Sequence, residues 1–437
     1  MRDLLILGLY VPSIIYGFKS PFAALMVYYW ISLMNPHRLG WGFTADLPLA
    51  MIAAIVTIAS IIINHKQITF IITKELLLFL LFWAFVTLTT VFAFYPEDAW
   101  SYWMTTSKIF LMAAITIIIV NTPKRLVLLL LGITLFIGFY GVKGAIFGIL
   151  TGGQYKVWGP PNSYIGDNND LGLALVMVAP LCFFIKDIFR TKIYTIILFG
   201  IGITTIISSI LTYSRGALLG LIFMVFFMIS RSRHKLIYLT ASIIIILITV
   251  PLLPSHWFDR MATIETYEED QSANMRLNSW ATSVNLALEN VLGGGFLCFR
   301  AEQYKKYSPD LSFGNAGQTA HSIYFQILME HGFIGLIIFL TIILIVIINL
   351  LRLNKFVSSS QQESTWISQI SRALFVSMMA FLVSGAFLSR AYFDLFWVIF
   401  AASICLKTMI NYGETYLPEH DSYRSIFKLP SIKYRYL

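Results

Sequence analysis

Three titratable side chains stand at the start of a long apolar run, and their types suit acid–base or metal chemistry. They are His321, Glu330 and His331, in the stretch TAHSIYFQILMEHGFIGLIIFL (319–340). On one helix, residues nine apart at about 100° each lie on opposite faces, so a His321–Glu330 acid–base pair is not expected. His331 would be offset from His321 by about 80° and lie deeper, which disfavours a metal ion shared by both histidines. His321 is therefore the candidate for chemistry, and a structural contact at the helix start is its alternative role.

Two arginines could supply positive charge near this histidine. Arg215 opens an apolar run in LTYSRGALLG, where a charge at the membrane is costly unless it has a partner. A guanidinium there suits an anion, and Gly216 would let a ligand approach the backbone at the helix start. Snorkelling to lipid headgroups is the alternative. Arg276 lies one turn before Trp280 in the amphipathic stretch described below, and we expect it on the same side of the membrane.

Several other polar and aromatic residues are secondary candidates. Lys143 falls inside an apolar run (FYGVKGAIFG), so an acidic side chain or a phosphate is expected near it, and Asp167 is a possible partner. Trp158, in a Gly/Pro-rich loop, could stack on a sugar ring, although aromatic residues are also common at membrane interfaces. Arg390 and Asp394 are expected to pair with each other.

The sequence offers no convincing acidic cluster for a metal ion. Glu97 and Asp98 are adjacent in YPEDAW, and such a pair is more typical of a helix start than of a metal site. We therefore predict neither a metal nor another cofactor.

The elements that position these residues are membrane helices. Hydrophobic residues make up 58% of the chain and charged residues 12%, and long apolar runs recur from end to end, as in an all-α polytopic integral membrane protein. Of the three cysteines, Cys182 and Cys405 lie in apolar runs and Cys298 in a polar segment, so no disulfide is expected. The net charge is +9, and the basic residues lie mostly in short loops between the apolar runs. In that position they indicate how the chain is oriented in the membrane and not that it binds nucleic acid.

Loop charges predict the orientation of the chain. Basic loops are expected inside and the remaining ones outside, which places all the candidate residues on the outer side. The basic segments are 121–125, 186–192, 231–235, 352–355 and a cytoplasmic tail at 411–437. We expect 12 to 13 transmembrane helices in one membrane domain spanning 1–437, with residues 4–34 forming either two spans or a re-entrant hairpin. The expected spans are near 47–63, 75–94, 104–120, 126–150, 170–185, 193–211, 217–230, 236–253, 332–351, 373–388 and 395–410.

The segment 254–320 is the only long polar excursion and is expected to lie on the outer side of the membrane, which is the periplasm if the resemblance described below holds. Apolar residues recur at helical spacing within ANMRLNSWATSVNLALENV (273–291), which predicts an amphipathic helix at the membrane interface. Trp280 would lie at headgroup level, and Gly293, Gly294 and Gly295 would end the helix. The acidic run 265–270 is expected to be a solvated loop.

Three sequence blocks, in order, resemble the O-antigen ligase/polymerase superfamily: TYSRGALLG, NMRLNSWATSVNLALENVLGGGF and HSIYFQILMEHGFIG. Two further stretches, MNPHRLGWGF (34–43) and GDNNDLGLALVM (166–177), resemble the subgroup of O-glycosylation ligases. The resemblance covers about residues 35–340. One departure is Ser322, where relatives often have Asn.

The resemblance implies a metal-independent, inverting glycosyltransferase of a bacterial inner membrane, with its active site facing the periplasm. It would transfer a glycan from a polyprenyl diphosphate to a hydroxyl of lipid A-core or of protein Ser/Thr, with Arg215 and Arg276 on the diphosphate and His321 as general base. Membrane lipids are expected partners and nucleic acid is not. A polymerase with the same donor chemistry stays open, as does the different class of a polytopic transporter, which would favour ionisable groups near the membrane midplane.

Overall fold

The computed structural model describes residues 1–40, 42–68, 71–189, 191–231, 235–262, 271–313, 317–359 and 365–411, and within these ranges the chain forms helices and no strand. Eight helices of this described part are long and apolar enough to cross a membrane, and four shorter apolar helices accompany them. The predicted all-α polytopic fold is confirmed. The predicted acidic loop at 265–270 and the basic tail beyond Asn411 lie outside the described residues.

Most apolar runs become helices close to their predicted bounds, but the helices Pro96–Ile119, Ile323–Ser359 and Thr365–Gly385 begin eight or nine residues before the predicted spans. Proline opens α5 and α6, and Thr73, Thr122 and Asp167 cap the first turns of α4, α6 and α7. Residues 2–34 form two helices, the second of which ends in a π-helical turn. The helices are α1 (Arg2–Gly17), α2 (Pro21–Tyr29), α3 (Leu49–Ile63), α4 (Lys74–Val91), α5 (Pro96–Ile119), α6 (Pro123–Leu150), α7 (Asn168–Ile185), α8 (Lys192–Ile210), α9 (Arg215–Arg231), α10 (Lys235–Thr249), α11 (Ser255–Ala262), α12 (Gln271–Glu289), α13 (Ala301–Tyr307), α14 (Ile323–Ser359), α15 (Thr365–Gly385) and α16 (Asp394–Asn411).

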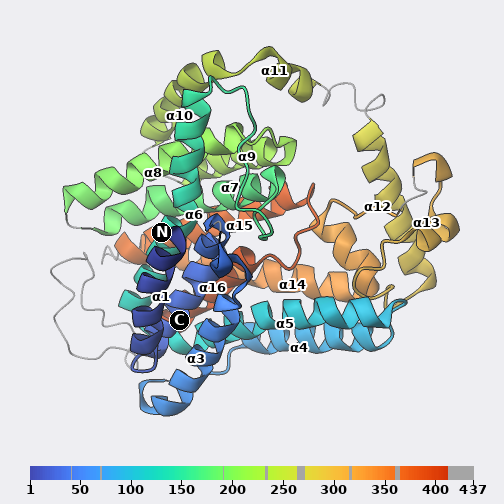
Figure 1. The fold of residues 1–437 in the computed structure, drawn as a ribbon, viewed down its shortest axis with the longest axis horizontal. Helices are drawn as coiled ribbons and strands as arrows, with labels where there is room; N and C mark the ends of the chain where they lie inside the picture. Colours follow the sequence, from blue (N-terminus) through green and yellow to red (C-terminus); the bar gives the residue numbers. More distant parts are fainter. Residues whose placement is uncertain are drawn as a thin grey trace.

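Helices α7 and α16 form the centre of the bundle, with α15 packed against both (Figure 1). Every residue of α7 except Asn169 is buried, as expected for a helix that is apolar all round. In α16, Trp397 and Phe396 join a cluster of aromatic rings, in which Phe381 stacks on Phe396 at 4.1 Å between centroids. Glycines let α6 approach α8 closely, since a Cβ at Gly144 would lie 2.1 Å from Ser208 Oγ.

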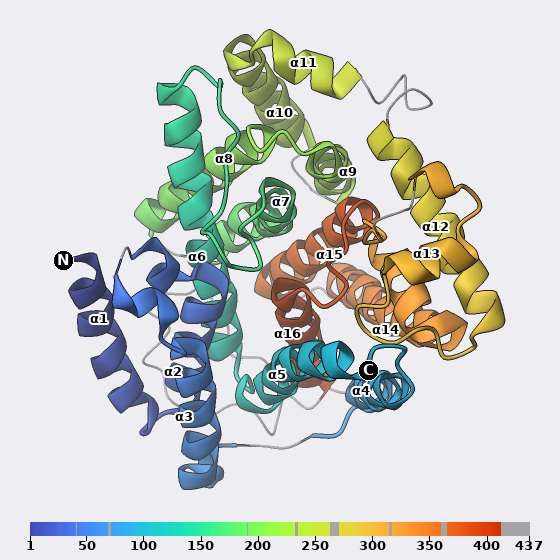
Figure 2. The ribbon, with the colours of Figure 1, turned by 45° about the vertical axis from the view of Figure 1, so that its right-hand side comes forward.

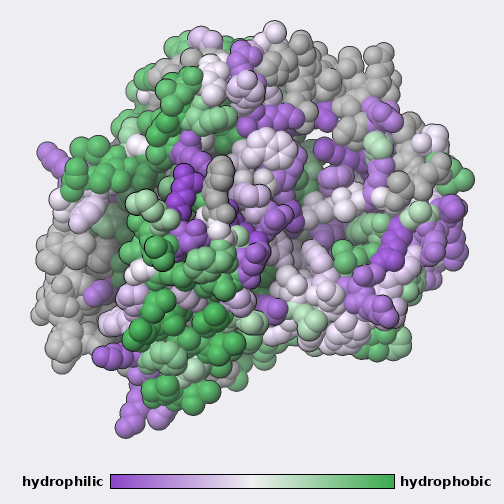
Figure 3. Space-filling model, in the orientation of Figure 1, coloured by the Kyte–Doolittle hydropathy of each residue, from purple (hydrophilic) through white to green (hydrophobic). Residues whose placement is uncertain are grey.

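Helices α12 and α13 lie to one side of the bundle, against the start of α14 (Figure 2). The predicted amphipathic helix is confirmed as α12, and only part of its apolar stripe, Trp280 and Ala287, packs on the protein. Leu277, Leu288 and Val291 are exposed, whereas a face of short polar side chains that includes Ser279 and Ser283 is buried. The spacing predicted the helix, but it did not predict that the short polar side chains would be buried against the protein. In the view of Figure 3, hydrophobic residues cover the region of α1 and α3, and hydrophilic residues gather towards α12 and α13.

Helix α14 is broken at Gly332, which has φ 65° and ψ −172°. The break leaves carbonyl groups without their helical donors, and the glycine turn after α12 supplies replacements. Gly294 N–H donates to Met329 O at 2.8 Å and Gly295 N–H to Glu330 O at 2.9 Å. Gly332 must lack a side chain, because a Cβ there would lie 2.1 Å from Val291 O. The three-glycine segment therefore docks on α14, in addition to following the end of α12.

Candidate functional site

The residues before α14 form a loop, 317–322, that α12 and α13 hold in place. Trp280 Nε1–H donates to Ala320 O at 2.8 Å, and the indole stacks on Phe325 at 5.0 Å with an interplanar angle of 9°. Tyr304 of α13 donates to Gln318 O at 2.7 Å. Trp280, expected only as a headgroup anchor, thus fixes the backbone beside His321.

His321 stands on this loop in a left-handed backbone conformation, with φ 45°. Such a φ is unfavourable for a residue with a Cβ and costs about 1–3 kcal/mol, so it persists only where surrounding contacts hold the chain. The side chain is exposed and lies before the first residue of α14, Ile323. Because His321 is not part of the helix, the helical angles used above do not apply to it.

Two of the other predicted site residues act electrostatically on His321. Desolvation by the surrounding protein lowers the pKa of this imidazole, Arg276 lowers it further, and Asp167 opposes both effects. The net direction is downward, so His321 is neutral near pH 7 and able to accept a proton. Arg276 and Asp167 therefore both lie within electrostatic range of His321.

Arg215 begins α9, at the corner that follows α8. Ser214 caps the helix, since its Oγ accepts from Ala217 N–H at 3.3 Å. The corner is tied to the start of α7, because Asn168 Nδ2–H donates to Thr212 O at 2.7 Å. This bond places Arg215 at the same end of the bundle as Asp167. Gly216 faces the turn after α15, where a Cβ added to this glycine would lie 3.2 Å from Phe387 Cβ, so it serves helix packing and not the predicted ligand approach.

Asp167 and Lys143 are not partners, which corrects the pairing considered from sequence. Asp167 caps α7 and accepts from Asn169 N–H at 2.8 Å. Lys143 is exposed on α6 and lines a cavity with Arg2 and Arg38. Trp158 is exposed in the loop 151–167, where 54% of its surface is accessible.

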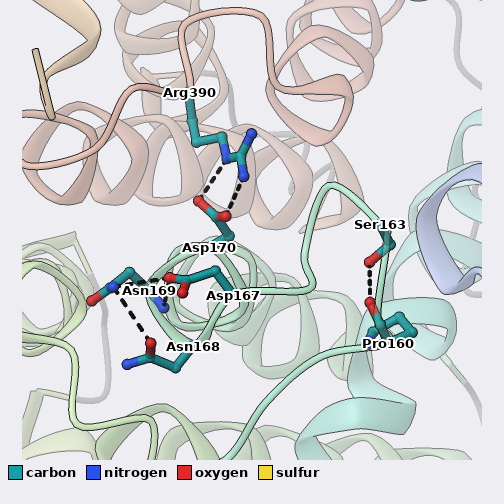
Figure 4. A network of polar contacts seen from close by, with 7 residues as sticks. All are labelled: Pro160, Ser163, Asp167, Asn168, Asn169, Asp170 and Arg390. Carbon is teal, nitrogen blue, oxygen red and sulfur yellow. Dashed lines mark hydrogen bonds and ion pairs between the residues drawn. The ribbon is translucent and has the colours of Figure 1, made fainter. Parts of the chain in front are cut away.

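Arg390 pairs with Asp170 and not with Asp394 as predicted (Figure 4). Its Nε–H donates to Asp170 Oδ1 at 2.6 Å, and a second guanidinium nitrogen contacts Oδ2. Asp394 accepts instead from Ser32 Oγ at 2.7 Å. The guanidinium also lies 5.9 Å from the centroid of the Tyr164 ring. The bidentate pair joins the turn before α16 to the start of α7.

Glu330 and His331 belong to a buried network that sequence reasoning missed. Tyr392 Oη–H donates to Glu330 Oε2 at 2.7 Å and lies 2.7 Å from His331 Nε2, while Thr89 Oγ1 lies 2.6 Å from His331 Nδ1. Leu297 N–H contacts the other oxygen of Glu330. Both groups are thus occupied by the protein itself, and no sequence signal linked them to Tyr392 or Thr89. We assign them to stabilising the break in α14.

The acidic pair in YPEDAW forms the first turn of α5, as the helix-start interpretation predicted. Asp98 forms an ion pair with Arg300, whose guanidinium lies 4.0 Å from the centroid of the Tyr95 ring. Across the described part of the chain, no group of three or more His, Cys, Asp and Glu side chains is placed to hold a metal ion.

Comparison with known families divides the chain into two parts. Residues 200–340 match a family model described as O-antigen ligase. This match supports the O-antigen ligase superfamily. It contains Arg215, Arg276 and His321, and it supports a function of the glycan ligase or polymerase type. Residues 1–190, which contain Lys143 and Asp167, match a family of unknown function (DUF5935). No curated protein matches the chain.

Proposed function

We propose that the protein transfers a glycan from a polyprenyl diphosphate to an acceptor hydroxyl at the periplasmic face of a bacterial inner membrane, as an O-glycosylation or O-antigen ligase. The match over residues 200–340 supports the reaction class. The eight long apolar helices of the described residues support membrane-bound substrates. The predicted loop charges support the periplasmic side.

In the proposed reaction, the acceptor oxygen attacks the anomeric carbon, and the bond from this carbon to the diphosphate oxygen breaks with inversion. His321 takes the proton of the acceptor hydroxyl. Arg215 and Arg276 stabilise the charge that grows on the departing diphosphate, since guanidinium groups bind phosphate oxygens in a bidentate manner. The chemistry uses these side chains without a metal ion.

The observation that carries this proposal is the placement of His321 within the matched region, on a loop that Trp280 of α12 holds, with Arg276 one turn before Trp280 on the same helix. A base must be neutral before it accepts a proton, and desolvation and the nearby cation both keep the pKa of His321 below its ordinary value. In the proposed reaction the same cation also stabilises the diphosphate bound beside the imidazole. One positive group thus favours both the neutral base and the anionic leaving group.

The acceptor is tested by reconstituting the purified protein with a polyprenyl-diphosphate glycan. Lipid A-core, a protein rich in Ser/Thr and a second glycan-lipid are offered separately. Product on either of the first two indicates a ligase, and elongation of the glycan-lipid indicates a polymerase. Transfer is expected to persist in excess EDTA, and loss that Mg²⁺ restores would contradict the proposed charge stabilisation. Uptake of donor without covalent product would favour a transporter. Transporters often bind their substrate at a broken helix, but the break in α14 is filled by the glycine turn.

The roles of the side chains are tested by measuring donor affinity and transfer rate separately. His321→Ala is expected to slow transfer by roughly 10²–10⁴-fold and to leave donor binding nearly unchanged, because the proton moves only in the transition state. Arg215→Lys and Arg276→Lys should weaken both quantities, since Lys lacks the bidentate geometry. The base assignment fails if His321→Ala retains full transfer, or if His331→Ala, which removes a member of the buried network, is the only variant to lose transfer among samples of equal monodispersity.

A further inference from the structure

Tyr213 has an unusual backbone conformation in the turn between α8 and α9. Its φ is 61°, in the left-handed region where glycine is the usual residue and a side chain as large as that of tyrosine is unfavourable. A residue stays in such a conformation only where surrounding contacts hold the chain. Arg215 begins α9 two positions later, so the contacts that hold Tyr213 also set the position from which the guanidinium of Arg215 extends.

Three hydrogen bonds join this turn to residues 153–168, between the end of α6 and the start of α7. Each acts on a different residue of 211–213. Tyr213 Oη–H donates to Gly153 O, Val157 N–H donates to Leu211 O at 3.0 Å, and Asn168 Nδ2–H donates to Thr212 O at 2.7 Å. The tyrosine is fully buried, with 1% of its surface accessible, so water cannot easily replace the bond from its hydroxyl.

The acceptor of the Tyr213 hydroxyl is itself held in place. Gly153 follows α6 with φ 70°, and its N–H donates to Gly148 O at 2.7 Å, which closes the end of that helix. The end of α6 lies directly against the turn, because a Cβ added to Gly148 would lie 2.2 Å from Leu211 Cδ1. The bond from Tyr213 therefore ties the backbone that leads to Arg215 to the end of α6.

We propose that Tyr213 is a positioning residue for the candidate site, because its hydroxyl fixes the turn that presents Arg215 to an anionic substrate. This inference rests on the proposed function, in which Arg215 binds the diphosphate. Ser214 completes the connection, since its Oγ accepts from Ala217 N–H at 3.3 Å and so fixes the first turn of α9. The buried hydroxyl of Tyr213 acts through the backbone and not by contact with the diphosphate. A small displacement of this backbone moves the guanidinium out of the geometry that bidentate phosphate binding requires.

Tyr213→Phe tests this role by binding measurements that need no glycan transfer. A short-chain polyprenyl diphosphate and the corresponding polyprenol, both without sugar, are titrated against the full-length protein in phosphatidylcholine nanodiscs. The ratio of the two dissociation constants, polyprenol over diphosphate, isolates the contribution of the diphosphate. Tyr213→Phe should lower this ratio about five-fold, since it removes the bond to Gly153 O and keeps the ring. Asn168→Ala, which removes a second bond to the same turn, should lower the ratio as well.

Tyr10→Phe is the matched control. Tyr10 is also buried and its Oη–H donates to Leu49 O at 2.7 Å, so this variant loses the same kind of bond at α1 and α3. A purely structural role of Tyr213 predicts a lower midpoint of thermal unfolding and an unchanged ratio for both variants. An unchanged ratio in Tyr213→Phe, or an equal fall in Tyr10→Phe, would overturn the proposal. If Tyr213→Phe does not fold, Asn168→Ala decides by the same two criteria.

A double-mutant cycle shows whether Tyr213 acts through Arg215. Arg215→Lys alone should lower the ratio, and adding Tyr213→Phe should lower it little further, because lysine has no bidentate geometry left to lose. Losses that multiply would mean that Tyr213 acts elsewhere and would reject the positioning role. An unchanged ratio in Arg215→Lys would instead refute the diphosphate role in the proposed function, and this inference with it, so the two failures give different results.

Discussion

Replacing Trp280 by Phe should release the loop that carries His321. The substitution removes the indole N–H that donates to Ala320 O at 2.8 Å and keeps an aromatic ring to stack on Phe325. Ala320 is fully buried, so its carbonyl would lose a partner that water cannot easily replace, at a cost of about 1–3 kcal/mol.

That cost is comparable to the strain stored at His321. The left-handed conformation is unfavourable by about 1–3 kcal/mol, so losing one restraint of similar size should let the loop relax towards ordinary backbone angles. The bond from Tyr304 to Gln318 O would still hold the loop at its first residues. We therefore expect partial and not complete loss of the active arrangement, with transfer falling about 5-fold or more.

The assay compares transfer rate with donor affinity for Trp280→Phe. The rate should fall while donor affinity changes little, because the substitution moves the base and leaves Arg276 on α12. Trp100→Phe is the control, since Trp100 is exposed on α5 and is not a candidate site residue. Unchanged transfer in Trp280→Phe would show that the Trp280 contact does not position His321, and equal losses in both variants would point to a general effect of removing tryptophan.

Three further predictions follow from the same contacts. The proposed base must be neutral, so the transfer rate should fall as the pH drops below the pKa of His321. Arg276→Gln should raise this pKa and move the fall in rate to higher pH, whereas Asp167→Asn should lower the pKa and move it to lower pH. Opposite or absent shifts in the pH profile would reject the coupling. Asp170→Asn leaves the largely buried guanidinium of Arg390 without a counter-charge and should lower the free energy of unfolding by roughly 2–3 kcal/mol. The measurement is the midpoint of thermal unfolding in detergent, which should fall. A cysteine at position 271 should react with a membrane-impermeant thiol reagent in intact cells and one at position 232 should not, and the reverse pattern would place the site in the cytoplasm.

The parts of the fold that local sequence patterns encode were predictable. Apolar runs and basic loops located the helices, and helical spacing located α12, because these signals depend on neighbours a few residues apart. Sequence reasoning also proposed His321, Arg276 and Asp167 as site residues, and the latter two act electrostatically on His321.

Contacts between distant residues were not predictable in this way. Arg390 and Asp170 are 220 positions apart, and local charge spacing suggested Asp394 instead. The break at Gly332 was also missed, because a single glycine in an apolar run is compatible with a continuous helix. Only the carbonyls of Met329 and Glu330, satisfied by a distant glycine turn, show why the break is stable.

The candidate site draws on both family matches, which bears on the region of unknown function. His321 and Arg276 lie within residues 200–340, whereas Asp167 lies within 1–190 and acts on the same imidazole. The two regions are also joined by the bond from Asn168 to Thr212 O, and the start of α7 is held from the far end of the chain by Arg390. An aspartate that caps α7 can influence the base only if these contacts hold the helix start in place. The N-terminal region thus contributes Asp167, which raises the pKa of His321, and Asn168, which joins the two matched regions.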